Sequence, residues 1–144
     1  MFTDREIILR LVLSIVLSGL IGLERQMHRK TAGFRTHILV SMGSCLIMLT
    51  SLYVFDIYKD KAAIDPARIA AGVITGIGFL GAGAIIRERE NVKGLTTAAS
   101  LWMVSGIGLA VGCGFQKAAV YATVLAFITL LFFRYLEDKY FTHK

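Results

Sequence analysis

The sequence has few of the residues that mark disulfide scaffolds, metal sites and soluble surfaces. It contains two cysteines and three histidines, and only 18% of its residues are charged. Cys45 and Cys113 have neither disulfide nor zinc spacing, and the histidines lack metal-ligand spacing. A soluble globular protein needs more polar surface than this composition provides. These absences exclude a cysteine-based scaffold and argue against a water-soluble fold.

Catalytic patterns are also missing. The sequence has no Ser/His/Asp or Cys/His arrangement, no Walker A sequence and no paired carboxylates at membrane depth. Gly76-Ile-Gly78-Phe-Leu-Gly81 matches the spacing of dinucleotide-binding folds, but that fingerprint requires a strand and a soluble βαβ unit. Here the glycines lie inside an apolar run, which favours membrane helix packing. We therefore expect no enzyme and no cofactor.

Apolar length is what the sequence has in abundance. Its hydrophobic fraction is 56% and its mean hydropathy is +0.66. A helix needs ~20 residues to cross a ~30 Å hydrocarbon core, and five apolar runs approach that length. They lie at Ile7–Leu23, His37–Phe55, Ile69–Ile86, Thr97–Gly112 and Ala118–Leu136. The sequence predicts a single transmembrane domain over residues 1–144, an all-α bundle of about five helices.

The basic residues set the expected orientation. Five spans place the two termini on opposite sides of the membrane. Ten of the 16 Lys and Arg residues fall on the side of the C-terminus and six on the other. Cytoplasmic loops carry the excess, so we expect the C-terminus in the cytoplasm and the N-terminus outside. The net charge of +6 then suits loops at an anionic bilayer surface, and we expect no nucleic-acid partner.

Glycines concentrate in the third and fourth predicted spans. Each costs a water-exposed helix about 0.5–1 kcal/mol against alanine, whereas small residues in a membrane let helices approach closely. We expect the third span to be a central helix pressed against others over most of its circumference. The fifth span should lie at the lipid-facing periphery or at a subunit contact. The predicted packing glycines are Gly72, Gly76, Gly78, Gly81, Gly83, Gly108 and Gly112.

Polar residues mark the ends of the spans. Asp65 before Pro66 predicts the N-cap of the third span, and the hydroxyls of Thr96 and Thr97 could cap the fourth. The charged turn from Arg87 to Lys93 lies at the face that we expect to matter for function. On the outward side, Asp56, Asp60 and Asp65 could together bind a hard divalent cation, but interleaved lysines argue against a tight site.

A polar cluster is predicted at the cytoplasmic face, where four spans meet. Glu24 should pair with a cation such as Arg35 or Arg87, because an unpaired carboxylate is costly there. Two helix N-termini, near Thr36 and Thr96, should present free N–H groups. The predicted cluster is Glu24, Arg25, Arg35, His37, Arg87, Lys93, Thr96 and Thr97. It would hold a lipid phosphate, inorganic phosphate or an acidic partner segment; an ordinary contact with the phospholipid surface is the alternative.

Five motifs follow one another from the first to the fourth predicted span. They are Gly22-Leu-Glu-Arg-Gln26, Ala32-Gly-Phe-Arg-Thr-His37, Asp65-Pro-Ala-Arg68, Gly76-Ile-Gly-Phe-Leu-Gly-Ala-Gly83 and Gly94-Leu-Thr-Thr-Ala-Ala-Ser-Leu-Trp102. Together they resemble the MgtC/SapB family of bacterial inner-membrane proteins, which is associated with magnesium limitation and survival inside host cells. The resemblance implies about five spans and, in the better-studied branch, protein contacts that restrain the rotary ATP synthase. Virulence-type members carry a soluble C-terminal domain, so a chain ending at Lys144 is expected to be a short form.

We therefore expect a non-enzymatic inner-membrane protein that packs through glycine faces as a homo-oligomer. The leading function is regulation of membrane energetics or of magnesium and ion homeostasis, through partner contacts at the cytoplasmic face. A small ion or solute transporter or channel is the alternative, with Glu24, Arg25 and Arg35 near its mouth. A structural lipid-binding scaffold is a third possibility.

Overall fold

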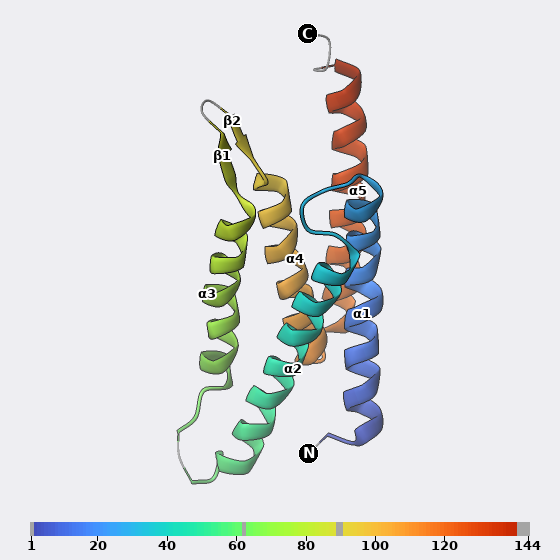
Figure 1. Ribbon diagram of the computed structural model, residues 1–144. Coiled ribbons are helices and arrows are strands. Elements are labelled where there is room, and N and C mark those ends of the chain that lie inside the picture. The colour runs from blue at the N-terminus through green and yellow to red at the C-terminus, as the bar shows by residue number, and fades with distance from the viewer. Residues whose placement is uncertain (1, 62, 89–90, 141–144) are drawn as a thin grey trace.

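The computed structural model describes residues 2–61, 63–88 and 91–140. Within them, five helices form an all-α bundle (Figure 1): α1 (Asp4–Met27), α2 (Phe34–Tyr58), α3 (Pro66–Ala84), α4 (Leu95–Gly112) and α5 (Gln116–Tyr140). A short antiparallel hairpin of β1 (Ile86–Glu88) and β2 (Asn91–Lys93) connects α3 to α4. All five helices are long and apolar enough to cross a membrane, which confirms the predicted bundle.

The central helix of the bundle is α4. It packs against each of the other four helices, and half of its span is buried. In contrast, α3 packs mainly on α2 and α4, and its buried residues are Ile77 and Gly81. The expectation that the third span is central is therefore wrong. Glycines permit close approach, but they do not determine which helix is surrounded.

The predicted peripheral position of the fifth span is confirmed. Helix α5 packs on α1 and α4 along one side, and only 11% of its span is buried. Large apolar side chains such as Leu125, Phe132 and Phe133 are exposed on its outer side. Such a surface is stable in hydrocarbon and would be unstable in water.

Glycines allow the backbone of α2 to approach those of α1 and α4 closely. A Cβ atom at Gly108 would overlap the carbonyl oxygen of Ser41, and one at Gly112 would lie 2.7 Å from the carbonyl oxygen of Cys45. At Gly22 of α1, a Cβ atom would lie 2.9 Å from the Cα atom of Phe34. These backbones approach so closely that no side chain larger than hydrogen fits between them.

Most of the predicted packing glycines of α3 do not bring its backbone close to another helix within the chain. No atom of the described residues lies within 4 Å of a Cβ placed at Gly72, Gly76, Gly78 or Gly83. At Gly81 the nearest atom, the Cβ of Ala98, would lie at an ordinary 3.6 Å. Within the described chain these four glycines therefore make no close helix contact, and their packing against another copy stays a prediction.

The elements gather at two ends of the bundle (Figure 1). The α1–α2 connection, the hairpin and the last turns of α5 lie at one end, which we call the hairpin end. The start of α1 and the α2–α3 and α4–α5 connections lie at the other. The hairpin end therefore holds the segments predicted to be cytoplasmic; their side of the membrane stays a prediction.

Candidate functional site at the hairpin end

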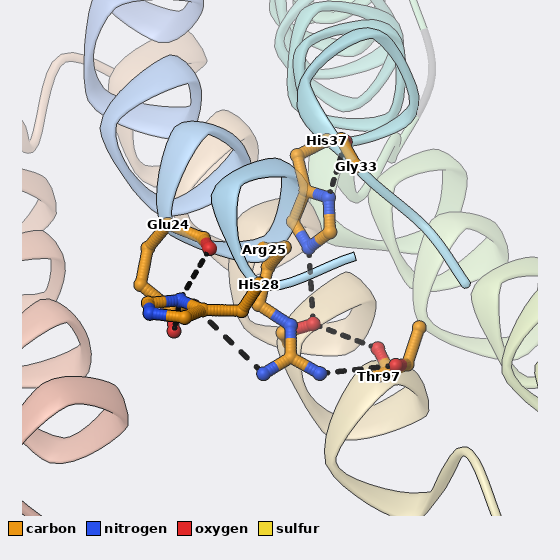
Figure 2. Close-up of polar contacts among 7 residues, drawn as sticks. Glu24, Arg25, His28, Gly33, His37 and Thr97 are labelled. Carbon is orange, nitrogen blue, oxygen red and sulfur yellow. Dashed lines mark hydrogen bonds and ion pairs between the residues drawn. The ribbon is translucent and has the colours of Figure 1, made fainter. Parts of the chain in front are cut away.

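Two buried charges lie near the end of α1. Glu24 and Arg25 are each only 3% exposed. Oε2 of Glu24 lies 3.8 Å from Nη1 of Arg25, and Oε1 lies 2.8 Å from Nδ1 of His28 (Figure 2). Nη2 of Arg25 donates to Oγ1 of Thr97 on α4 at 3.1 Å. The opposite charges offset part of each other's burial cost and tie α1 to the first turn of α4.

The expected pairing of Glu24 with Arg35 or Arg87 is wrong. Both arginines are exposed: Arg35 is in the first turn of α2, and Arg87 is in β1. His28 takes their place because residues four apart on a helix lie on the same face. This i, i+4 spacing was the signal in the sequence that could have identified the partner.

His37 joins α2 to α4 from a fully buried position. Its Nε2 lies 3.0 Å from Oγ of Ser100, and its Nδ1 lies 2.8 Å from the carbonyl oxygen of Gly33 (Figure 2). A carbonyl oxygen can only accept, so Nδ1 carries a proton. His37 therefore connects α2 to α4. It lines neither of the two cavities described below.

The first turn of α4 opens on a cavity of about 430 Å³, which we call the α4 cavity. The N-cap of α4 is Gly94, with φ of 91° and no capping side chain. The expectation that Thr96 or Thr97 caps this helix is wrong, because both lie inside its first turn. The N–H groups there have no side-chain acceptor and remain available to a ligand. The lining includes Arg25, Arg29, Lys30, Thr31, Lys93, Gly94, Thr96 and Thr97.

A second cavity, the α2 cavity, lies beside the first turn of α2. Its volume is about 540 Å³, and it is lined by Gln26, Lys30, Thr31, Gly33, Phe34, Arg35 and Thr36. The N-cap Gly33 also lacks a capping side chain. Lys30 and Thr31 line both cavities. Two uncapped helix N-termini therefore lie close to one cationic segment.

The predicted cluster is divided between these places. Arg25, Lys93, Thr96 and Thr97 line the α4 cavity, whereas Arg35 lines the α2 cavity. Glu24 and His37 are buried and line neither cavity. Arg87 lines neither, although it lies at the same end.

Arg29 and Lys30, which were not in the predicted cluster, reach the α4 cavity through the turn that ends α1. The N–H of Lys30 donates to the carbonyl oxygen of Arg25 at 3.0 Å, and that of Arg29 to Gln26 at 3.1 Å. Arg29 has a left-handed φ of 51°. This Schellman-type turn usually uses glycine at the left-handed position. Because arginine stands there, the turn could not be predicted.

The predicted charged turn between the third and fourth spans is a hairpin where it is described. Ile86 pairs with Lys93 and Arg87 with Val92, and Nζ of Lys93 lies 2.6 Å from Oε2 of Glu88. Residues 89 and 90 lie outside the described part. The hairpin adds exposed charge to the hairpin end.

Two of the three aspartates predicted as a possible cation site at the opposite end, Asp56 and Asp65, have local partners. Asp56 pairs with Lys59 at 2.8 Å, and Asp65 accepts from the N–H of Ala67 at 2.8 Å as the N-cap of α3. Among the residues that the structure describes, no group of three or more His, Cys, Asp and Glu is placed to hold a metal ion.

These features belong to a chain with well-matched relatives. The sequence model of the MgtC family matches residues 11–139. This chain belongs to the MgtC family. The resemblance seen in the sequence is thereby confirmed, and family and helices together identify a multi-pass membrane protein.

Two MgtC-family relatives show the extent of the likeness. The chain is 46% identical over 136 residues to "Putative magnesium transporter YhiD" of Escherichia coli (strain K12), covering 93% of this chain and 63% of that protein. It is 45% identical over 118 residues to "Protein MgtC" of Salmonella typhimurium (strain LT2), covering 82% of this chain and 48% of that protein. The chain thus spans about half to two thirds of these relatives' length. No solved structure matches it.

Proposed function

We propose that this protein regulates magnesium and ion homeostasis or membrane energetics without catalysis, through partner contacts at a cytoplasmic hairpin end. The observation that carries the proposal is the exposed cationic surface of that end. Arg29, Lys30 and Arg35 are exposed beside two uncapped helix N-termini, and Arg87 is exposed on the hairpin. Such a surface favours an acidic segment of a partner, through both side-chain charge and helix dipoles.

The middle of the bundle supports regulation over transport. Gly108 and Gly112 bring α4 into backbone contact with α2. Two buried hydroxyls there donate within their own helices, Ser18 to the carbonyl oxygen of Ser14 at 2.6 Å and Ser44 to that of Val40 at 2.8 Å, whereas the hydroxyl of Ser41 has no partner among the described residues. Backbone contact this close leaves no room for a hydrated ion between α2 and α4 at these positions.

The electrostatics of the hairpin end also disfavour a magnesium path. Mg²⁺ binds through oxygen ligands, usually carboxylates. Glu24, the buried carboxylate at this end, already has Arg25 and His28 beside it. A divalent cation approaching Glu24 would be repelled by the arginine.

Transport remains the second candidate. The name of the Escherichia coli relative suggests it, and Glu24 is a buried carboxylate at the hairpin end. In this alternative, Glu24 would bind the ion transiently near the membrane interface.

Flux through reconstituted vesicles separates the two functions. The protein in liposomes loaded with a Mg²⁺-sensitive dye should give no saturable uptake above protein-free vesicles. A Glu24→Gln variant is the matched control, since transport through this site would be lost in it. Saturable uptake by the original protein that disappears in Glu24→Gln would overturn the regulatory proposal.

Crosslinking tests the partner contact directly. A photoreactive residue replacing exposed Thr36, beside the intact Arg35, should capture a membrane complex in native membranes, and one replacing exposed Lys117 at the start of α5 should not. The family resemblance makes the ATP synthase the first candidate partner. Its proton pumping in inverted vesicles should fall when this protein is added and recover with Arg35→Glu. Equal capture from both ends, or pumping that does not respond, would contradict the proposal.

A further inference from the structure

We infer that the α4 cavity binds the phosphate of an anionic phospholipid, one acyl chain of which lies in an apolar groove along α4. This inference does not depend on the proposed regulatory function. It rests on a buried guanidinium at the cavity wall, an uncapped helix N-terminus and an apolar groove that adjoins the same cavity.

Arg25 supplies the buried donor. It is 3% exposed and lines the α4 cavity. Its Nη2 is satisfied by Thr97, but its Nε has no hydrogen-bond partner among the described residues. Arg25 thus brings a guanidinium charge to the wall of the cavity, and phosphate is the kind of anion that guanidinium groups pair with well.

The start of α4 supplies the second set of donors. Helix α4 has 18 residues and begins at Leu95 without a capping side chain. Its first-turn N–H groups and the positive end of its dipole therefore face the cavity that Arg25 lines. Phosphate can accept from both at once, whereas a carboxylate has fewer oxygens to offer.

The balance of charge around the cavity stays positive. Glu24 lies 3.8 Å from Nη1 of Arg25, and Lys93 pairs with Glu88 at 2.6 Å, so these acids offset two of the cations. Arg29 and Lys30 have no acidic partner in the part of the chain that is described. They provide the surplus charge that an anion needs.

An apolar groove of about 430 Å³ adjoins the cavity at Thr96. It lies between α4 and α5 and is lined by Thr96, Ala99, Met103, Leu125 and Ala126, among others. Thr96 lines both the groove and the α4 cavity. From Thr96 to Met103 the helix rises roughly 10 Å, along the direction of a lipid chain. A polar cavity beside an apolar groove matches a phospholipid, whereas free phosphate would use only the cavity.

The test measures thermal stability and bound lipid on the purified full chain in detergent. Phosphatidylglycerol should raise the unfolding midpoint and remain bound in native mass spectrometry, and phosphatidylcholine should do neither to the same extent. Replacing both exposed cations, Arg29→Gln with Lys30→Gln, should weaken phosphatidylglycerol binding roughly tenfold or more. Arg35→Gln, which removes a cation from the α2 cavity alone, is the matched control and should bind normally.

A groove variant distinguishes lipid from free anion. Ala99 is exposed, so Ala99→Phe should fold, fill the groove and reduce binding of phosphatidylglycerol. Inorganic phosphate alone should stabilise far less than the lipid. If phosphate matches the lipid and Ala99→Phe changes nothing, the site binds free anions and the lipid assignment is wrong. If both lipids bind equally, the site does not select an anionic headgroup and the proposal is wrong. If the double variant binds like the original, Arg29 and Lys30 do not hold the phosphate and the proposal is equally wrong.

Discussion

The guanidinium of Arg25 reaches from the end of α1 to the first turn of α4, where its Nη2 lies 3.1 Å from Oγ1 of Thr97. Both side chains are almost fully buried. The bond crosses 72 positions of sequence and joins the central helix to the chain's first helix. It therefore fixes the start of α4 beside the cationic turn that follows α1.

Removing the hydroxyl of Thr97 should destabilise the bundle. In Thr97→Val, Nη2 of Arg25 loses its acceptor in a buried site, which costs about 1–3 kcal/mol. Unfolding in detergent should show this as a lower midpoint, and Thr97→Ser should retain most of the stability. Thr96→Val is the control, since Thr96 is exposed. Equal stability of the Thr97 and Thr96 valine variants would show that the bond contributes nothing.

Two glycines of α4 should respond oppositely to alanine. In Gly108→Ala the new methyl group overlaps the backbone of Ser41, so α2 and α4 must separate, at a cost of about 1–3 kcal/mol. Gly106 has no atom of the described residues within 4 Å of an added Cβ. Gly106→Ala should be neutral or stabilise the helix by about 0.5–1 kcal/mol. Unfolding midpoints measured under the same conditions test the pair, and matching losses at both positions would contradict the described crossing.

Alanine should also be tolerated at Gly76 of α3. No described atom lies near its added Cβ, so Gly76→Ala should stabilise the helix by about 0.5–1 kcal/mol. The measurement is again the unfolding midpoint of the purified protein. A clear loss of stability would mean that another surface covers α3, as the predicted homo-oligomer would require.

The two native cysteines can test the orientation. Cys113 is exposed beyond the end of α4, whereas Cys45 is buried. If the N-terminus is outside, a membrane-impermeant maleimide should label Cys113 in spheroplasts, and Cys45 should stay unlabelled. In a Cys113→Ser background, a cysteine replacing Arg35 should react only in inverted vesicles. The reverse pattern would place the hairpin end outside.

The sequence was sufficient to predict the number and type of the helices. The length of an apolar segment decides whether it can cross a bilayer, and that length can be read directly from the sequence. The cap at Asp65 and the peripheral position of α5 also followed from local signals. Each of these features depends on residues close together in sequence.

The arrangement of the helices was not predictable in the same way. Gly76 and Gly108 occur in equally small-residue surroundings, yet only Gly108 contacts another backbone. Which face is covered depends on how all the helices pack together. The cationic site shows the same limit, since Arg29 reaches it through a left-handed turn that no glycine marks. In contrast, the Glu24–His28 pair was accessible from spacing alone.

The backbone at Gly94 gives the hairpin a mechanical role. Gly94 turns with φ of 91°, and an added Cβ atom would overlap the carbonyl oxygen of Ala84, the last residue of α3. The base of the hairpin is thus held between the end of α3 and the start of α4, and it has little freedom to move independently of them. A molecule that binds the strands and displaces them would therefore also displace the start of α4. Because Gly108 of α4 contacts the backbone of α2, α2 would have to move with it.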